Sequence, residues 1–340
     1  MNLYCSPNIM NHQLVEAVRK KTAVSEVVSH DGERHPGNGI LLTKNRGNFL
    51  KPCPGQKGHV CCGYQVVEWG LGCIFKCEYC VLQKYIHSGD LILYTNWEDC
   101  FNEISRLRQT ISGPIRIGTG EFGDSLAIED FFPFNSAIID FTANLGDIIL
   151  ELKTKSANIN ALRERPRKDH VVVAFSLNPQ SYIDAFEHGT ASLAKRLDAA
   201  AQVAVWGYNL AFHFDPIIAR PDWETSYQNV ISILREKIPA KKVKWISIGT
   251  FRFPKGFQEI AEIEFPKSDI FAEEFYPSAD GKMRYFRPFR EKIYKFIIEK
   301  LGKSFPDSAA YICMESPDVW ERATGKSWCS AALKSYLDSF

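Results

Sequence analysis

Residues 66–83 read VVEWGLGCIFKCEYCVLQ and join an apolar run to a loop that holds three cysteines. The run VVEWGL has the length and the composition of a strand. Cys73, Cys77 and Cys80 follow it at a C-x3-C-x2-C spacing. Tyr79 stands directly before the last cysteine. This stretch therefore predicts a strand that leads into a candidate metal-binding loop.

The sequence downstream repeats the alternation of apolar runs with amphipathic stretches. Together with 66–71, the predicted strands are 114–119, 147–153, 170–177, 209–217 and 243–252. The predicted helices between them are 97–111, 134–144, 157–164, 190–205 and 223–237. Six strands that alternate with helices predict an α/β protein with a parallel sheet and right-handed crossovers.

Four polar segments come directly after predicted strands. They are the cysteine loop, GTGEFGDS at 118–125, KTKSAN at 153–158 and SLNPQSY at 176–182. Parallel α/β sheets carry their functional groups at the carboxyl ends of the strands. We therefore expect all four segments to lie on one face of the sheet edge.

The composition is that of an ordinary globular protein. Of the 340 residues 45% are hydrophobic and 24% are charged, the mean hydropathy is −0.20 and the formal net charge is +1. Such a small charge gives no overall attraction to nucleic acid, so any such contact needs a local basic patch. No apolar run reaches the roughly 18 residues that span a bilayer. The first residues also lack the pattern of a secretory signal, so we expect a cytoplasmic protein without membrane contact.

Cysteine is clustered in this sequence. Six of the ten cysteines lie within 28 positions, namely Cys53, Cys61, Cys62, Cys73, Cys77 and Cys80. In a reducing compartment such a cluster indicates metal or redox chemistry rather than disulfides. Cys100, inside the helical pattern WEDCFNEISRLRQ, is expected to be a small buried hydrophobe instead.

The three-cysteine loop allows three interpretations. A structural zinc site needs a fourth ligand, and the nearest candidates are His59, Cys61, Cys62 and His87. In a second interpretation the three cysteines are structural and bind no metal. The third is a 4Fe–4S cluster, in which three thiolates leave one of the four irons open. An open iron is what a catalytic cluster needs in order to bind a small molecule directly.

The C-x3-C-x2-C pattern with an aromatic residue before its last cysteine, after the first strand of a βα repeat, resembles the radical S-adenosylmethionine (SAM) superfamily. In that superfamily SAM chelates the open iron through its amino and carboxylate groups. An electron from the cluster then cleaves SAM to methionine and a 5′-deoxyadenosyl radical, which abstracts a substrate hydrogen. The resemblance implies a partial (β/α)6 TIM-like barrel with a 4Fe–4S cluster on Cys73, Cys77 and Cys80.

Further motifs are similar to those of the spore photoproduct lyase family. They run in order as GC-x3-C-x-YC-x-LQ at 72–83, TK at 154–155, FSLN at 175–178, E-x-GT at 187–190 and FRF at 251–253. This resemblance implies repair of pyrimidine-dimer lesions in DNA, with a reducing electron donor of the flavodoxin or ferredoxin type. It also implies a set of SAM-binding residues, which are Tyr79, Gly118, Thr119, Gly120, Glu121, Lys155, Ser176 and Asn178.

Two features depart from the family pattern. Photoproduct lyases return a hydrogen atom from a cysteine after the second strand, but IGTGEFGDS at 117–125 contains no cysteine. The chain also has extra cysteines, which are Cys53, Cys61, Cys62 and Cys313. One hypothesis gives all four to an auxiliary iron–sulfur cluster. In a second, Cys61, Cys62 or Cys313 is the hydrogen donor, and in a third the thiols are inert in a tight loop.

The segment KMRYFRPFREK at 282–292 alternates basic with aromatic residues. Basic groups that bind phosphates and aromatic faces that stack on bases are how unstacked nucleic acid is held. The candidate contacts are Arg284, Tyr285, Arg287 and Arg290. The alternative is the start of an amphipathic helix that runs to Lys300.

The predicted organisation has three parts. A loop-rich, cysteine-bearing N-terminal extension (1–65) precedes the barrel (66–300), and a C-terminal segment (301–340) packs back towards the extension. The substrate is lesion-bearing DNA, or a peptide or small molecule if the basic segment is only helical. A third hypothesis is a zinc or iron–sulfur protein without radical chemistry.

Overall fold

The computed structural model describes residues 2–22, 24, 26–30, 37, 39–53, 55, 58–86 and 89–339. His87, a candidate zinc ligand in the sequence, lies outside the described residues. The chain forms two compact units. Unit 1 comprises Met1–Lys51, Gln65–Ile74 and Leu82–Val171, and unit 2 comprises Pro52–Tyr64, Phe75–Val81 and Val172–Phe340. Each unit has its own strands and helices and is described by itself.

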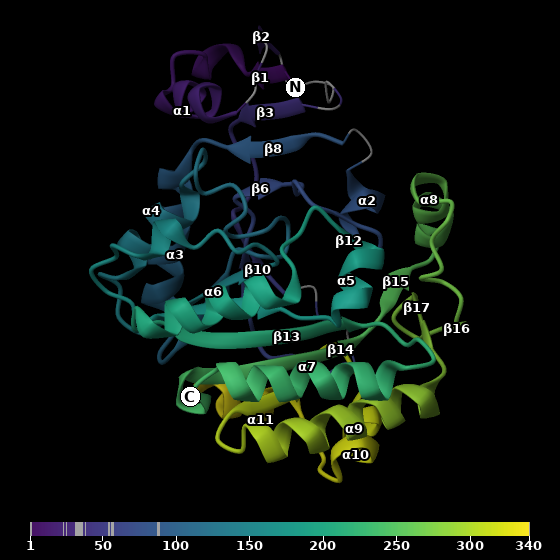
Figure 1. The fold of residues 1–340 in the computed structure, drawn as a ribbon. Coiled ribbons are helices and arrows are strands. Elements are labelled where there is room, and N and C mark those ends of the chain that lie inside the picture. Colours follow the sequence, from purple (N-terminus) through teal and green to yellow (C-terminus); the bar gives the residue numbers. More distant parts are fainter. Residues whose placement is uncertain are drawn as a thin grey trace. The chain divides into compact units, whose positions relative to one another are not determined.

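The N-terminal part of unit 1 is a five-stranded sheet with the order β2-β1-β3-β8-β6. Its strands are β1 (Asn2–Cys5), β2 (Val27–Ser29), β3 (Gly39–Thr43), β8 (Leu91–Tyr94) and β6 (Gly70–Leu71), and Figure 1 shows β1 and β3 beside α1 (Gln13–Lys21). The prediction of a loop-rich N-terminus is therefore wrong. Short strands such as β1 and β2 gain stability by pairing with residues far along the chain, which local periodicity does not reveal.

The second set of strands in unit 1 is parallel, with β9 between β5 and β10. These strands are β5 (Gln65–Val67), β9 (Ile115–Gly118) and β10 (Ile148–Thr154). The other elements are η1 (Pro7–Ile9), β4 (Leu50–Pro52), α2 (Leu82–Tyr85), α3 (Trp97–Thr110), α4 (Phe134–Thr142) and η2 (Asn160–Leu162). The predicted strands 114–119 and 147–153 and the predicted helices 97–111 and 134–144 are confirmed.

The predicted strand 66–71 is in fact two short strands in two sheets. β5 pairs in parallel with β9, whereas β6 pairs antiparallel with β8. Trp69 lies between β5 and β6 and anchors this corner. Its indole N–H donates to the Thr119 carbonyl at 2.7 Å, and its ring stacks on Phe132 and Phe134. The chain therefore changes sheets at a buried aromatic residue.

The predicted helix 157–164 is also wrong, because only the single turn η2 forms there. Side-chain hydroxyls upstream of this turn compete for the backbone. The Ser156 N–H donates to the Thr154 hydroxyl at 2.9 Å, and the Asn158 N–H donates to the Ser156 hydroxyl at 2.9 Å. Such local bonds favour turns over helices.

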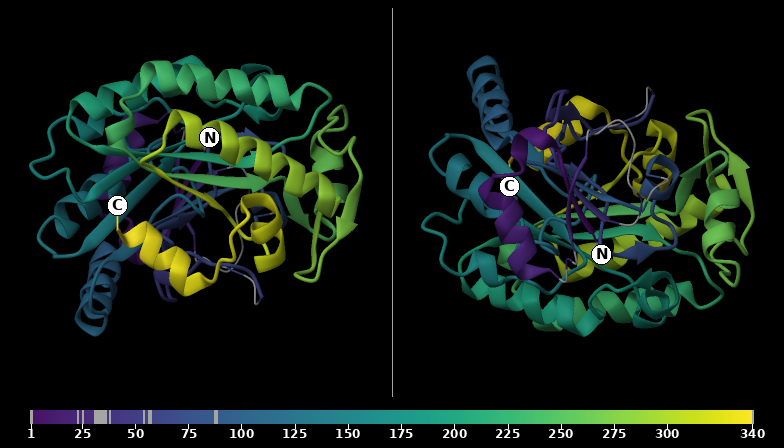
Figure 2. Two further views of the ribbon diagram at one scale, coloured as in Figure 1. Left: turned by 90° about the horizontal axis from the view of Figure 1, so that it is seen from below. Right: turned by 90° about the horizontal axis from the view of Figure 1, so that it is seen from above.

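The core of unit 2 is a parallel sheet with the order β18-β14-β13-β11. These strands are β11 (Val171–Ser176), β13 (Asn209–Ile217), β14 (Val243–Thr250) and β18 (Ala309–Ile312). Its helices are α5 (Gln180–Phe186), α6 (Leu193–Val205), α7 (Trp223–Lys237), α9 (Arg287–Ser304), α10 (Pro317–Thr324) and α11 (Ser330–Asp338), with η3 (Ala240–Lys242). Figure 2 shows α7 and α9 side by side. The remaining predicted strands, and the helices 190–205 and 223–237, are confirmed.

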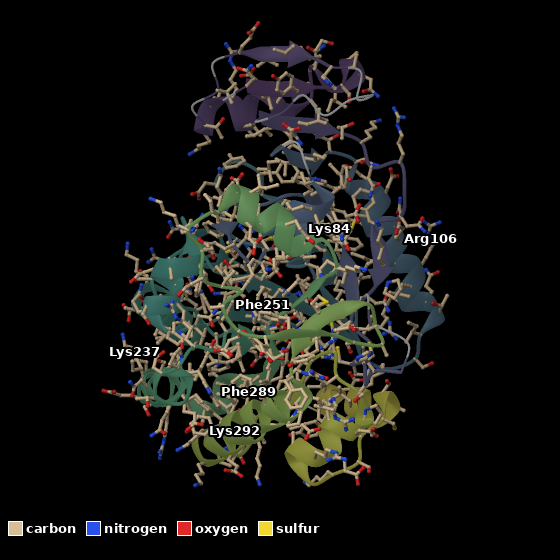
Figure 3. The ribbon with its side chains drawn as sticks, turned by 90° about the vertical axis from the view of Figure 1, so that its right-hand side faces the viewer. Lys84, Arg106, Lys237, Phe251, Phe289 and Lys292 are labelled. Carbon is tan, nitrogen blue, oxygen red and sulfur yellow. The ribbon has the colours of Figure 1, made fainter. Side chains whose placement is uncertain are left out.

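Two small sheets complete unit 2. β15 (Arg252–Pro254), β17 (Lys282–Tyr285) and β16 (Phe275–Pro277) pair antiparallel beside α8 (Phe257–Glu264), and β7 (Lys76–Cys77) pairs with β12 (Glu187–His188). Phe251, labelled in Figure 3, packs among the rings of Phe253, Phe271 and Phe275. In the part of the chain that the structure describes, no helix combines the length and the apolar character that a bilayer crossing requires.

Candidate active site

In unit 2 a short strand and a turn set the positions of the last two motif cysteines. β7 pairs antiparallel with β12, so that Cys77 lies opposite Glu187. The Cys80 N–H donates to the Cys77 carbonyl at 3.0 Å, and the Glu78 N–H donates to the Phe186 carbonyl at 2.9 Å. Cys77 is only 6% exposed. The backbone from Cys77 to Cys80 is therefore fixed by main-chain bonds.

The carboxylate of Glu187 is the centre of a buried hydrogen-bond network behind this turn. Its Oε1 accepts from the Tyr79 hydroxyl at 2.5 Å and from the Asn178 amide at 2.8 Å. Its Oε2 accepts from Arg196 Nη2 at 2.5 Å, and both side chains of this ion pair are fully buried. On its other side the Asn178 amide oxygen accepts from the Tyr227 hydroxyl at 2.7 Å. One acidic group thus ties the cysteine turn to the end of β11.

Arg196 also binds the threonine of the E-x-GT segment. Its guanidinium donates to the Thr190 hydroxyl at 2.7 Å and to the Ser176 carbonyl at 2.9 Å. A buried guanidinium needs several acceptors, and here they come from one motif and one strand end. Burial, and then the charge of Glu187, raise the pKa of the Tyr79 hydroxyl well above its usual value. Tyr79 is therefore a neutral donor.

A second clamp holds the outer side of the turn. Glu78 is 5% exposed, its Oε1 lies 2.8 Å from His188 Nε2, and its other oxygen accepts from the Ser268 hydroxyl. The sequence alone does not point to Glu78, Ser268 or Arg196 as residues of the site. The one available signal is the position of Glu78, a charged residue between two motif cysteines.

In unit 1 the residue before Cys73 is fastened to the cysteine-free segment GTGEFGDS. The Gly72 N–H donates to the Phe122 carbonyl at 2.9 Å. Gly72 has φ +110°, a conformation that favours glycine. A Cβ at Gly72 would lie 2.8 Å from the Asp90 carbonyl oxygen. The segment that lacks the family cysteine therefore helps to position the start of the SAM motif.

Asp124 links the same segment to the end of β10. Its carboxylate accepts from the Thr154 hydroxyl at 2.7 Å and from the Lys155 N–H at 2.6 Å. It also accepts from the N–H groups of Leu126 and Ala127 at 3.0 and 2.9 Å. The TK motif is thus held by its hydroxyl and its backbone. The side chain of Lys155 is half-buried.

Three of the predicted SAM contacts have structural partners in unit 1. Thr119 is fully buried, and its hydroxyl binds Ser125 at 2.8 Å and Asn135 at 2.5 Å. Its N–H and carbonyl are bonded as well, so its polar groups hold the loop. Glu121 forms an ion pair with Lys153. Gly118 lies buried in β9.

Gly120 lies where the segment approaches β10 most closely, and alanine should be destabilising there. An added Cβ would stand 2.5 Å from Lys153 Cβ and 3.0 Å from its carbonyl oxygen. Overpacking of this kind costs about 1–3 kcal/mol. Gly120→Ala should lower the unfolding free energy by that amount in denaturant titrations. Gly146→Ala, with nothing within 4 Å, is the matched control, and an equal loss in both variants would contradict this reading.

The predicted nucleic-acid segment 282–292 is β17 followed by the start of α9. Arg284, Tyr285 and Arg290 are buried, which contradicts their proposed role as nucleic-acid contacts. Arg284 and Arg290 bind Glu315 at 3.3 and 2.9 Å. These cations neutralise a buried carboxylate, because a buried charge requires a partner. Of the four candidates, only Arg287 has a substantially exposed side chain, and it pairs with Glu291 at 2.8 Å.

The cysteines outside the motif divide into two groups. Cys100 is fully buried in α3, which confirms it as a small hydrophobe, and burial raises the pKa of its thiol. Cys53, Cys61, Cys62 and Cys313 line one pocket of unit 2. The N-terminal and C-terminal cysteine segments therefore meet, as expected from the sequence.

Comparisons with known proteins identify the family. The family model described as spore photoproduct lyase matches residues 62–311, more than half of the chain. The chain belongs to the spore photoproduct lyase family. Spore photoproduct lyase of Bacillus subtilis (strain 168) is 27% identical over 69% of this chain and 68% of that protein. The Geobacillus sp. (strain Y412MC61) protein is 27% identical over 60% of this chain and 61% of its own length.

Solved spore photoproduct lyase structures share the fold. A cysteine-to-alanine variant superposes with a TM-score of 0.80 at 19% identity, covering 91% of this chain and 98% of that one. A double variant solved with bound AdoMet and dinucleoside spore photoproduct gives 0.79 at 20% identity, with the same coverage. These matches confirm the α/β fold with a partial TIM-like barrel. By family the protein is a radical SAM enzyme of the spore photoproduct lyase type, as the motifs predict.

Proposed function

We propose that this spore photoproduct lyase family member cleaves SAM at a 4Fe–4S cluster held by Cys73, Cys77 and Cys80. The observation that carries this proposal is the buried Glu187 network, which fixes the motif turn inside the stretch that the family model matches. Three thiols within eight residues fit such a cluster and leave one iron for SAM. When bound, the cluster supplies the electron that cleaves SAM.

The zinc alternative has less support. A zinc ion gathers its ligands in one coordination sphere. Among the described residues, no group of three His, Cys, Asp or Glu side chains is placed to hold a metal ion in this way. A 4Fe–4S cluster binds each thiolate at a different iron, so its ligands need not converge on a point. The three motif thiols match the number that a 4Fe–4S cluster with one open iron requires.

We propose a smaller set of SAM contacts than the motifs imply. The Asn178 amide is engaged on both sides, by Glu187 and by Tyr227, so Asn178 is a positioning residue. The Tyr79 hydroxyl is bonded too, so that any contact with SAM would come from its ring. Ser176 at the end of β11 and Lys155 at the end of β10 are the proposed polar contacts. A lysine there would pair with the SAM carboxylate.

The proposed substrate is a spore photoproduct-type lesion in DNA. Support comes from family membership and from the relative that was solved with dinucleoside spore photoproduct. Tyr276 and Phe286 form an exposed aromatic pair with ring centroids 5.4 Å apart, and Arg287 follows directly. Exposed rings next to a cation are suited to unstacked bases. We place the DNA contact at this pair in place of the buried Arg284, Tyr285 and Arg290.

Two further partners belong to this proposal. The reducing electron donor is a flavodoxin or ferredoxin, since the cluster must be reduced before each cleavage. The hydrogen donor is not on GTGEFGDS, which has no cysteine, and Cys61, Cys62 and Cys313 are the sequence candidates for it. Clustered thiols also favour the reducing cytoplasm as the location.

One assay tests this function. The anaerobically reconstituted protein is incubated with SAM, dithionite and a dinucleoside spore photoproduct, and 5′-deoxyadenosine and restored thymidine dinucleotide are quantified. We expect both products, with none from the cyclobutane dimer of the same dinucleotide. Formation of 5′-deoxyadenosine without repair of the lesion would favour the alternative, a peptide or small-molecule substrate. Absence of both 5′-deoxyadenosine and restored dinucleotide would refute radical chemistry.

A further inference from the structure

A pocket in unit 2 gathers four cysteines that the SAM motif does not use. Cys53, Cys61 and Cys62 come from the segment before the motif, and Cys313 directly follows β18. All four line the pocket together with His59. Segments from opposite ends of the chain therefore supply one thiol-rich site.

Hydrogen bonds fix both segments around this pocket. Val60 forms an antiparallel bridge with Glu315, and the Val60 N–H donates to the Glu315 carbonyl at 2.9 Å. The Cys61 N–H donates to the Ser330 hydroxyl at 2.9 Å, at the start of α11. The Cys313 N–H donates to a carbonyl of β14 at 2.7 Å. The thiols therefore extend from backbone that is already ordered.

Cationic side chains lie beside the pocket. Arg252 Nη2 is 3.4 Å from Met314 Sδ, and Lys282 Nζ is 3.8 Å from the same sulfur. Positive charge stabilises thiolates, and the thiolate is the form of cysteine that binds metal. Two cations therefore stand beside the thiols, of which Arg252 also pairs with Asp215 at 3.0 Å.

His59 gives an independent indication of a ligand. Its Nδ1 is buried and has no hydrogen-bond partner among the described residues. A buried polar atom without a partner is costly, because it has given up its bonds to water and gained none. A bound group that forms a bond with Nδ1 would remove that cost.

We propose that Cys53, Cys61, Cys62 and Cys313 bind a second 4Fe–4S cluster, with His59 Nδ1 beside it. Four thiolates complete the ligand set of such a cluster, in contrast to the three of the SAM motif. A single ion would need convergent ligands, and the described residues contain no group placed in that way. The assignment makes these cysteines ligands and replaces their role as hydrogen donors.

The FRF segment joins this pocket to the SAM motif. Phe251 packs against Tyr79 with ring centroids 6.5 Å apart, and its neighbour Arg252 contacts Met314. Cys313 also lies at the carboxyl edge of the same parallel sheet that carries Asn178. The second cluster therefore belongs to the functional edge of unit 2.

The test measures iron and acid-labile sulfide in the anaerobically reconstituted full chain. The variant Cys73→Ala/Cys77→Ala/Cys80→Ala should retain about four irons and four sulfides, against about eight of each in the unmodified protein. Replacing Cys53, Cys61, Cys62 and Cys313 with serine should also leave about four irons. Cys329→Ser, which removes an exposed cysteine, is the control and should leave about eight.

The motif variant decides the matter alone if the four-serine variant fails to fold. The proposal would be overturned if the motif variant bound no iron after reconstitution. It would also be overturned if that variant bound zinc and no sulfide, or if the four cysteines formed disulfides. In the motif variant, His59→Ala should shift the electron paramagnetic resonance spectrum of the reduced cluster, and an unchanged spectrum would remove His59 from the site. None of these measurements depends on SAM cleavage. The second cluster can therefore be confirmed or refuted even if the proposed function is wrong.

Discussion

Replacing Cys77 with alanine should abolish the formation of 5′-deoxyadenosine from SAM and remove about four irons per chain. The cluster needs three thiolates, and two ligands leave a second iron exposed to solvent and to loss. Cys77 is 6% exposed and is held by the β7–β12 pairing, so no neighbouring group replaces its sulfur easily. Iron analysis and quantitative chromatography of 5′-deoxyadenosine measure the two effects.

The matched control is Cys100→Ala, which removes another buried cysteine at a site with no chemical role. It should keep both its iron and its SAM cleavage. Cys53→Ala should lose only iron of the second cluster and retain measurable cleavage. If Cys53→Ala lost cleavage as completely as Cys77→Ala, the division into a SAM cluster and a second cluster would be refuted.

Local sequence patterns predicted the elements whose stability is local or whose burial is complete. The helix 223–237 has its buried residues, Trp223, Tyr227, Val230, Ile231 and Leu234, at helical spacing, and its bounds agree with the structure. Every residue of VVVAFS in β11 is buried, as a continuous apolar run indicates for a covered parallel strand. The strands β1 and β2 have three or four residues, too few for a periodic signal.

The site was predictable only where its residues are close in sequence. The spacing of the three motif cysteines is local, and so it could be read directly. The burial of Arg284 depends on Glu315, which is 31 positions away, and no local pattern contains that pairing. The role of Asp124 depends on the Lys155 N–H, also 31 positions away. The alternation of basic and aromatic residues in KMRYFRPFREK suggests an exposed surface, because the acidic partner Glu315 lies outside this segment.

Removing the Glu187 carboxylate should produce the largest loss of stability among single substitutions in the site. Glu187→Ala leaves Arg196 fully buried without its counter-ion, and breaking one side of a buried pair costs about 3–5 kcal/mol. It also removes the acceptor of the Tyr79 hydroxyl. Tyr79 lies between Cys77 and Cys80 in the sequence, so the motif turn loses a contact as well. Denaturant unfolding of the apoprotein, followed by circular dichroism, measures the change.

The control is an ion pair of the same kind on the surface. Asp198 binds Lys237 at 2.5 Å with side chains 65% and 38% exposed, and Asp198→Ala should cost less than about 1 kcal/mol. Equal losses in the two variants would show that burial of the Glu187 network is unimportant. Glu187→Gln separates charge from shape. It keeps an acceptor for Tyr79 but cannot neutralise Arg196, so its stability should fall between those of the alanine variant and the unmodified protein.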